Sequence, residues 1–289
     1  MAADFLVSDP RPALTPAAST PVLRFTSGGE TLQGVLHLPA GPGPHPIAVV
    51  LHGFPGNERN FDLAQALRRA GYAALVFHYR GSWGMGGTWS WGHVLEDAAR
   101  VTAEIRTDPV ARAHRLDPGR LALIGHSTGG FAALMTAADD PTIGAVASIS
   151  CFDFGAVART LSDPAVRRGY VEAFEDELLP LRGTSGETLV AEMEAAGDAW
   201  RLAELAPRLA DRPVLLVGTS RDPVTPHEAH HEPLVKAYEA QPVPRLEHRV
   251  FPTDHALSDH RLALTRTVVD FLDRRLAARE EEEKGDGPE

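Results

Sequence analysis

The residues with the clearest chemical potential form the turn Gly125-His126-Ser127-Thr128-Gly129. An apolar run leads into this turn, and residues with helical spacing follow it. A Gly-x-Ser-x-Gly sequence between a strand and a helix predicts a sharp turn that lifts the serine hydroxyl out of a sheet. Free N–H groups at the helix start favour negative charge beside that hydroxyl. Ser127 is therefore the candidate nucleophile, and His126 is expected to pack or to support its neighbours.

A serine nucleophile needs a base that removes its proton and an acid that orients the base. His255 ends the segment Phe251-Pro-Thr-Asp-His255, which follows the last predicted strand, and it is the candidate base. Asp222 follows another predicted strand by a short loop and is the candidate acid. Asp254 is its rival, but a residue adjacent to a histidine rarely reaches that histidine's Nδ1.

Alternating strand and helix patterns must position these side chains. The strands are expected at Val22–Thr26, Thr31–Leu38, Ile47–Leu51, Tyr72–Phe77, Leu121–Ile124, Ile143–Ser150, Pro213–Val217 and Leu246–Phe251. Helices are expected at Phe61–Ala70, Val94–Ile105, Ala132–Ala138, about 227–239 and 258–276. Gly28-Gly29 is the expected turn between the first two strands. This alternation predicts an α/β fold with a mainly parallel, doubly wound sheet and helices on both faces.

One long connection interrupts the alternation. Residues 152–211 contain three helical patterns, at Ala156–Leu161, Ala165–Leu179 and Glu187–Glu204. A connection of this length with its own helices is usually functional, so we expect a helical cap over the sheet; a structural excursion that touches no substrate is the alternative. The expected organisation is an extended lead-in (1–21), a core (22–151 and 212–278), the cap (152–211) and a disordered acidic tail (279–289).

These motifs resemble the α/β-hydrolase superfamily over roughly residues 22–276, and within it bacterial serine esterases related to the prolyl oligopeptidase-type hydrolases. The matching stretches, in the order that the family has, are His52–Gly56, Tyr79–Gly87, Gly125–Gly129, Gly218–Pro226 and Asp254-His255. The chain order Ser127, Asp222, His255 is that of the superfamily. The resemblance implies an eight-stranded sheet and an oxyanion hole made by the backbone N–H groups of Phe54 and Thr128.

Other residues give weaker signals. Trp83, Trp89 and Trp91 follow the carboxyl end of a strand, where ligands bind in such sheets, so they either line a substrate pocket or pack beneath the cap. The sequence His227-Glu-Ala-His-His231 offers imidazoles but no evident third ligand, so a solvated helix start is expected rather than a metal site. Acids of the cap, namely Glu172, Glu175, Asp176 and Glu177, either capture a substrate amine or lie on a solvated helix face.

Composition narrows the class of partner. The net charge is −11, and the last ten residues contribute −5 of it, so nucleic acid is not an expected partner. The single cysteine, Cys151, excludes an internal disulfide and a multi-thiolate metal site. The N-terminal residues lack the features of a signal peptide, and no segment approaches the ~20 apolar residues of a membrane span. We expect a cytoplasmic protein without metal or cofactor; a homodimer stays open.

The expected function is cleavage of carboxylic esters through an acyl-enzyme intermediate, with a small-molecule ester as the substrate. Feruloyl- or acetyl-esterase activity is a narrower variant that the residue types do not resolve. The alternative is a peptidase or amidase, although the resembling oligopeptidases carry a large N-terminal propeller and only about twenty residues precede the first strand here. A non-catalytic binding protein is a third possibility, against which the complete set of Ser127, Asp222 and His255 argues.

Overall fold

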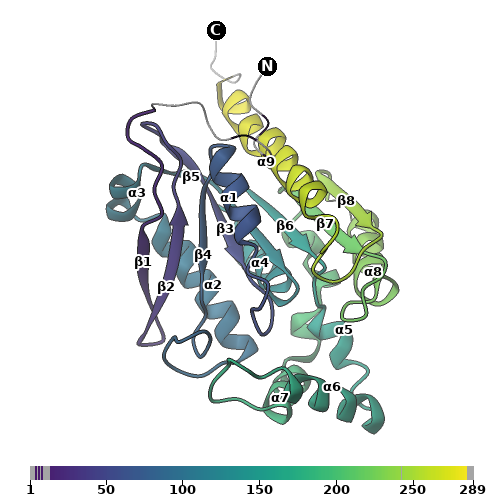
Figure 1. Cartoon of the computed structure of the whole chain (residues 1–289). Helices are drawn as coiled ribbons and strands as arrows, with labels where there is room; N and C mark the ends of the chain where they lie inside the picture. The colour runs from purple at the N-terminus through teal and green to yellow at the C-terminus, as the bar shows by residue number, and fades with distance from the viewer. Residues whose placement is uncertain (1–3, 5, 7, 9–13, 242, 285–289) are drawn as a thin grey trace.

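A single eight-stranded sheet organises the molecule (Figure 1). The computed structural model describes residues 4, 6, 8, 14–241 and 243–284, and for 277–284 the backbone alone. The strands are β1 (Val22–Ser27), β2 (Glu30–His37), β3 (His45–Leu51), β4 (Ala73–Phe77), β5 (Leu116–His126), β6 (Ala145–Ile149), β7 (Val214–Thr219) and β8 (Leu246–Phe251). They lie in the order β1-β2-β4-β3-β5-β6-β7-β8, and every pairing from β4 to β8 is parallel. The predicted α/β architecture is confirmed.

Helices cover both faces of this sheet. They are α1 (Phe61–Arg69), α2 (Trp91–Ile105), α3 (Asp108–His114), α4 (Thr128–Asp139), α8 (His227–Ala240) and α9 (Arg261–Lys284). Residues of α1 and α9 belong to one apolar cluster, and residues of α2, α3, α4 and α8 belong to the other. Strand β3 shows why both faces are covered. Its residues Ile47 and Val49 belong to one apolar cluster, whereas Ala48 and Val50 belong to the other. Alternate side chains of a strand point to opposite faces, so a strand covered on both faces is apolar throughout.

The connection between β6 and β7 is helical, as predicted, but the boundaries of its helices differ from those expected. It contains α5 (Phe154–Ala158), α6 (Pro164–Asp176), α7 (Gly186–Ala196) and the short 3₁₀ helices η1 (Gly197–Trp200) and η2 (Leu202–Arg208). The helix expected over Glu187–Glu204 was wrong because Gly197, at φ 48°, ends α7. In Figure 1, α5, α6 and α7 lie together beyond one end of the sheet.

Other boundaries also depart from the expectations. Helix α3, which was not predicted, follows α2 after a break at Arg106 and Thr107. Helix α9 continues to Lys284, past the tail boundary expected at 279, because alanine, arginine and glutamate favour helix. The rest of that expected tail, 285–289, lies outside the described residues, as do residues 1–3, 5, 7 and 9–13 of the expected lead-in. Among the described residues, no helix combines the length and the apolar character needed to cross a membrane.

Candidate active site

Ser127 stands at the junction between β5 and α4. Its backbone has φ 57° and ψ −122°, a combination that costs free energy for any residue with a side chain. The surrounding structure holds this turn, because the Ser127 N–H donates to Ile149 O at 2.9 Å and the Ser127 carbonyl accepts from the N–H groups of Gly130 and Phe131. The strained turn predicted from the sequence is therefore present, with Ser127 at its apex.

Close backbone packing explains the glycines of the turn. A Cβ atom added to Gly125 would overlap the carbonyl of Gly129, and one added to Gly129 would overlap the carbonyl of Leu51. Helix α4 therefore begins in direct contact with the ends of β5 and β3. A side chain at either position would force these elements apart.

Asp222 and His255 form a short, partly buried hydrogen bond. The His255 ring lies with Nδ1 2.7 Å from Asp222 Oδ2, and the Asp222 side chain is fully buried. Four other donors reach the same carboxylate, from the hydroxyls of Thr219 and Thr225 and the N–H groups of Val224 and Thr225. Burial opposes ionisation of Asp222, but these hydrogen bonds and the nearby His255 hold its pKa well below the usual range. Asp222 is therefore an ionised carboxylate that accepts a hydrogen bond from the Nδ1–H of His255.

Asp254, the rival acid, has a different role. Its carboxylate accepts from the Ser258 N–H at 2.8 Å and from the Ser258 hydroxyl at 2.7 Å, which closes the loop before α9. This places Asp222, and not Asp254, against the His255 ring.

His126 connects the turn that carries Ser127 (residues 125–129, the serine turn) to the loop that carries His255 (residues 252–260, the histidine loop). Its Nε2 lies 2.8 Å from the backbone carbonyl of His255, so Nε2 carries the proton and donates it. The two rings are 4.8 Å apart. Burial and the neighbouring His255 lower the pKa of His126 to about 3, so this ring is neutral near pH 7. The sequence identified no such contact, because nothing local shows that residues 126 and 255 meet.

The two expected oxyanion donors belong to the two segments next to Ser127. Thr128 is the first residue of α4, where an N–H has no acceptor within the helix. On the other side, a Cβ atom on Gly53 would stand 2.8 Å from Ser127 Cβ, so the turn that carries Phe54 touches the serine. His52 is fully buried and its Nδ1 lies 2.8 Å from Gly53 O, which fixes the peptide unit containing the Phe54 N–H.

Ser127 and His255 open into one cavity of about 640 Å³. No hydrogen bond joins Ser127 Oγ to His255 in the described part of the chain, and such bonds often tighten only in the substrate complex. The aromatic walls of the cavity are Phe54, Phe152, Tyr170 and Phe174, and its carboxylates are Glu58, Asp176 and Glu177; its lining contains no lysine or arginine. Helix α6 supplies Tyr170, Ala173 and Phe174 from one helical face.

The three tryptophans do not line this cavity, which corrects the expectation that they contact substrate. Trp89 and Trp91 are buried, and the Trp91 indole N–H donates to Leu189 O of α7 at 3.1 Å. Trp83 donates to Pro55 O at 3.0 Å and lies beneath the Arg59 guanidinium. The large rings of Trp89 and Trp91 pack against Phe54, which removes much apolar area from water.

Two histidines of α8, His230 and His231, are buried rather than solvated as expected, whereas His227 at the helix start is half-buried. His230 accepts a hydrogen bond from the Asp153 N–H at 3.1 Å, and the His231 ring packs against Gly218. Their burial lowers the pKa of each ring to about 4. Throughout the described residues, no group of three potential ligands could hold a metal ion.

A model of the alpha/beta hydrolase family matches residues 48–267, more than half of the chain, and this range contains Ser127, Asp222 and His255. The chain belongs to the alpha/beta hydrolase family. The family thus accounts for the strand order, the strained turn at the end of β5 and the sequence order of the three residues.

Alpha/beta hydrolases of several kinds share this fold. The esterase Pf2001 of Pyrococcus furiosus is 17% identical with a TM-score of 0.66, covering 93% of this chain and 98% of its own. Est1E from Butyrivibrio proteoclasticus, solved with ferulic acid bound, is 22% identical with a TM-score of 0.67, covering 88% and 99%. A curated relative, hydrolase LUC6 of a Fusarium species, is 32% identical over 163 residues; the match spans 51% of this chain but only 37% of that protein.

Proposed function

We propose that this protein is a serine hydrolase that cleaves carboxylic esters through an acyl-enzyme intermediate. Ser127 Oγ attacks the ester carbonyl while His255 takes its proton; His255 then gives that proton to the departing alcohol. Water, activated by the same histidine, releases the acid and restores Ser127. The observation that carries the proposal is the His255–Asp222 hydrogen bond of 2.7 Å in the cavity that the strained Ser127 enters. It holds the imidazole with Nε2 free to exchange a proton.

The backbone N–H groups of Phe54 and Thr128 are the proposed oxyanion donors. Attack by Ser127 moves negative charge onto the former carbonyl oxygen, and donors held in place beforehand stabilise it without reorganisation. The positive end of α4 adds to this effect. His52 supports Phe54 indirectly, because its hydrogen bond to Gly53 O orients the opposite, N–H, side of the same peptide unit.

The preferred substrate is proposed to be an uncharged ester with an aromatic or bulky apolar group. The cavity volume of about 640 Å³ is typical of small-molecule sites, and its aromatic walls suit such a group. Glu58, Asp176 and Glu177 disfavour an anionic acyl group, because no basic side chain in the lining offsets them. The ferulic acid bound to the structurally similar Est1E supports an aromatic acid product. The 152–211 segment acts as a cap in this proposal, through Tyr170 and Phe174.

A panel of nitrophenyl esters tests the proposal. Wild-type protein should hydrolyse uncharged aromatic and aliphatic esters, prefer them over a hemisuccinate ester of similar size, and leave aminoacyl nitroanilides largely uncleaved. Ser127→Ala should abolish turnover, and Ser8→Ala, at a partly buried serine near the N-terminus, is the matched control that should not. Ester hydrolysis that survives in Ser127→Ala would refute the mechanism, and faster cleavage of nitroanilides would favour the peptidase alternative.

A further inference from the structure

Strand β8 forms one edge of the sheet, and half of its six residues are exposed. It pairs with β7 on one side, and among the described residues no strand pairs with it on the other. His248, Arg249 and Val250 are all exposed, in contrast to the fully buried β7. An open strand edge presents unpaired N–H and C=O groups that can pair with another chain.

The hydrogen bonds to β7 determine which groups face outward. The Val214 N–H donates to Arg245 O at 3.3 Å, and the Ser220 N–H donates to Phe251 O at 2.9 Å. Since alternate residues of a strand point their backbone groups to opposite sides, residues 245, 247, 249 and 251 face β7, whereas Leu246, His248 and Val250 face outward. The Leu246 N–H already donates to Val243 O. The open edge therefore offers the Leu246 carbonyl and both backbone groups of His248 and Val250.

The side chains of this edge are complementary to a second copy of itself. Two copies of β8 can pair antiparallel about a two-fold axis through their outward-facing backbone groups. That axis can pass residue 247, 248 or 249 of both copies. Centring on Glu247 or Arg249 places two like charges opposite each other, which is unfavourable. Centring on His248 places Glu247 of each copy opposite Arg249 of the other. The charges therefore favour one register over its two neighbours.

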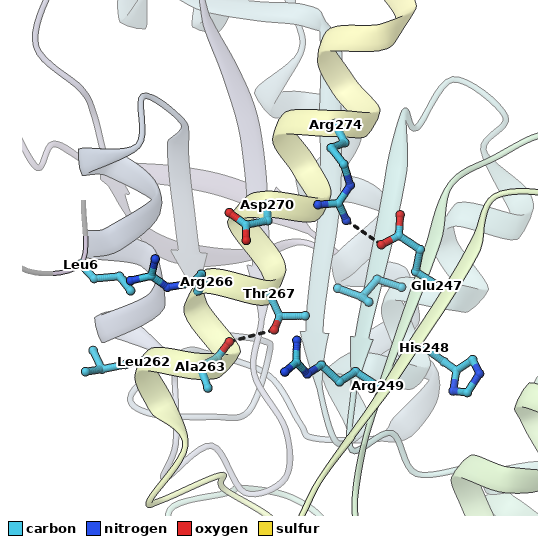
Figure 2. Close-up of a pocket in the computed structure, with 11 residues that line it drawn as sticks. Leu6, Glu247, His248, Arg249, Leu262, Ala263, Arg266, Thr267, Asp270 and Arg274 are labelled. Atoms are coloured by element: carbon cyan, nitrogen blue, oxygen red, sulfur yellow. Dashed lines mark hydrogen bonds and ion pairs between the residues drawn. The ribbon is translucent and has the colours of Figure 1, made fainter. Parts of the chain in front are cut away.

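Arg249 is available for such a contact. Glu247 is held by Arg274 and Arg275 of α9, at 2.7 Å and 2.8 Å, and the Arg274 pair is drawn in Figure 2. Arg249 lies on the same side of β8, across a groove of about 450 Å³ from α9. Its guanidinium stacks over the Phe251 ring at 5.0 Å, and it has no carboxylate partner within the described part of the chain.

We propose that two copies of this chain pair antiparallel along β8, with His248 at the two-fold axis. The pairing makes the two sheets continuous. The His248 N–H of each copy donates to the His248 carbonyl of the other, and each Val250 N–H donates to the opposite Leu246 carbonyl. Val250, 38% exposed, is then covered by Leu246 of the second copy. None of these residues lines the active-site cavity, so the pairing is independent of the ester chemistry.

Cysteine cross-linking tests both the interface and its register. Cα atoms of a hydrogen-bonded antiparallel pair lie about 5.5 Å apart, within disulfide range. His248→Cys should therefore form a covalent dimer under a mild oxidant, which accepts the two electrons released when the S–S bond forms. Val250→Cys is the matched control, because the two Val250 positions are displaced by four residues, roughly 13 Å, along the strands. The native Cys151 is buried and should not react.

Mass measurement in solution provides the second test. Wild-type protein should sediment as a dimer, and His248→Pro should sediment as a monomer with unchanged esterase activity, because proline removes an outward N–H and no bond to β7. His248→Val keeps that N–H and should stay dimeric. Arg249→Glu places like charges opposite each other and should weaken the dimer by about tenfold or more. A monomeric wild type, a dimer that survives His248→Pro, or equal cross-linking at positions 248 and 250 would overturn the proposal.

Discussion

Replacing His126 tests whether the link between the serine turn and the histidine loop controls the rate. His126 is covalently bonded to Ser127 and donates from Nε2 to His255 O at 2.8 Å. His126→Leu removes this donor while keeping an apolar side chain in a site that is 4% exposed. The histidine loop keeps its other backbone bonds, such as the Arg221 N–H to Thr253 O, so the protein should still fold.

The geometry predicts the size of the change in stability and in kcat. Leaving the His255 carbonyl without a donor should lower the free energy of unfolding by about 1–3 kcal/mol. A base that is free to drift by about 1 Å should lower kcat by roughly 10²-fold. KM should change less than kcat, because the lost hydrogen bond acts mainly on proton transfer, although His126 also lines the cavity.

The assay compares kcat and KM for a nitrophenyl ester in wild type, His126→Leu and His126→Gln. Glutamine can donate from its amide over a similar reach, so it should recover most of the lost kcat. Urea unfolding of the same proteins separates instability from misplacement of the base. Wild-type kcat in His126→Leu, or a stable His126→Gln protein as slow as His126→Leu, would refute the positioning role.

Three further predictions concern Asp222 and the turns that hold the active site. Asp222→Asn should lower kcat/KM by about 10⁴-fold, because an amide cannot hold the same tautomer of His255; a loss below tenfold in steady-state kinetics would contradict this. Gly129→Ala should yield little folded protein, as judged by circular dichroism, because its Cβ overlaps the Leu51 carbonyl; a stable, active variant would show that the contact can relax. Burial lowers the pKa of His52 from 6.5 to about 3, so only the unfolded chain binds this proton between those values, and stability should fall as pH drops through that window. In urea titrations, His52→Phe should reduce that slope by about 1.4 kcal/mol per pH unit, and an unchanged slope would contradict it.

The sequence predicts the sheet well because its strands are covered on both faces and are apolar throughout. It also places Ser127, Asp222 and His255, since each follows a recognisable strand in a fixed order. The cavity wall escapes prediction, because an apolar residue of α6 such as Phe174 has the same pattern whether it faces a cavity or a core. For the same reason the sequence could not decide whether Trp83, Trp89 and Trp91 line a pocket or pack beneath the cap. The His126 contact depends on a separation of 129 residues, which no local pattern reveals.

Trapping the acyl-enzyme tests the central claim most directly. Rapid mixing with a nitrophenyl butyrate, followed by acid quench and peptide mass spectrometry, measures whether the acyl group becomes attached to the chain. The mechanism predicts one butyryl group on Ser127, formed together with a burst of nitrophenol of about one equivalent and absent from Ser127→Ala. Steady hydrolysis by a fully active protein whose acyl group lies on another residue would contradict it.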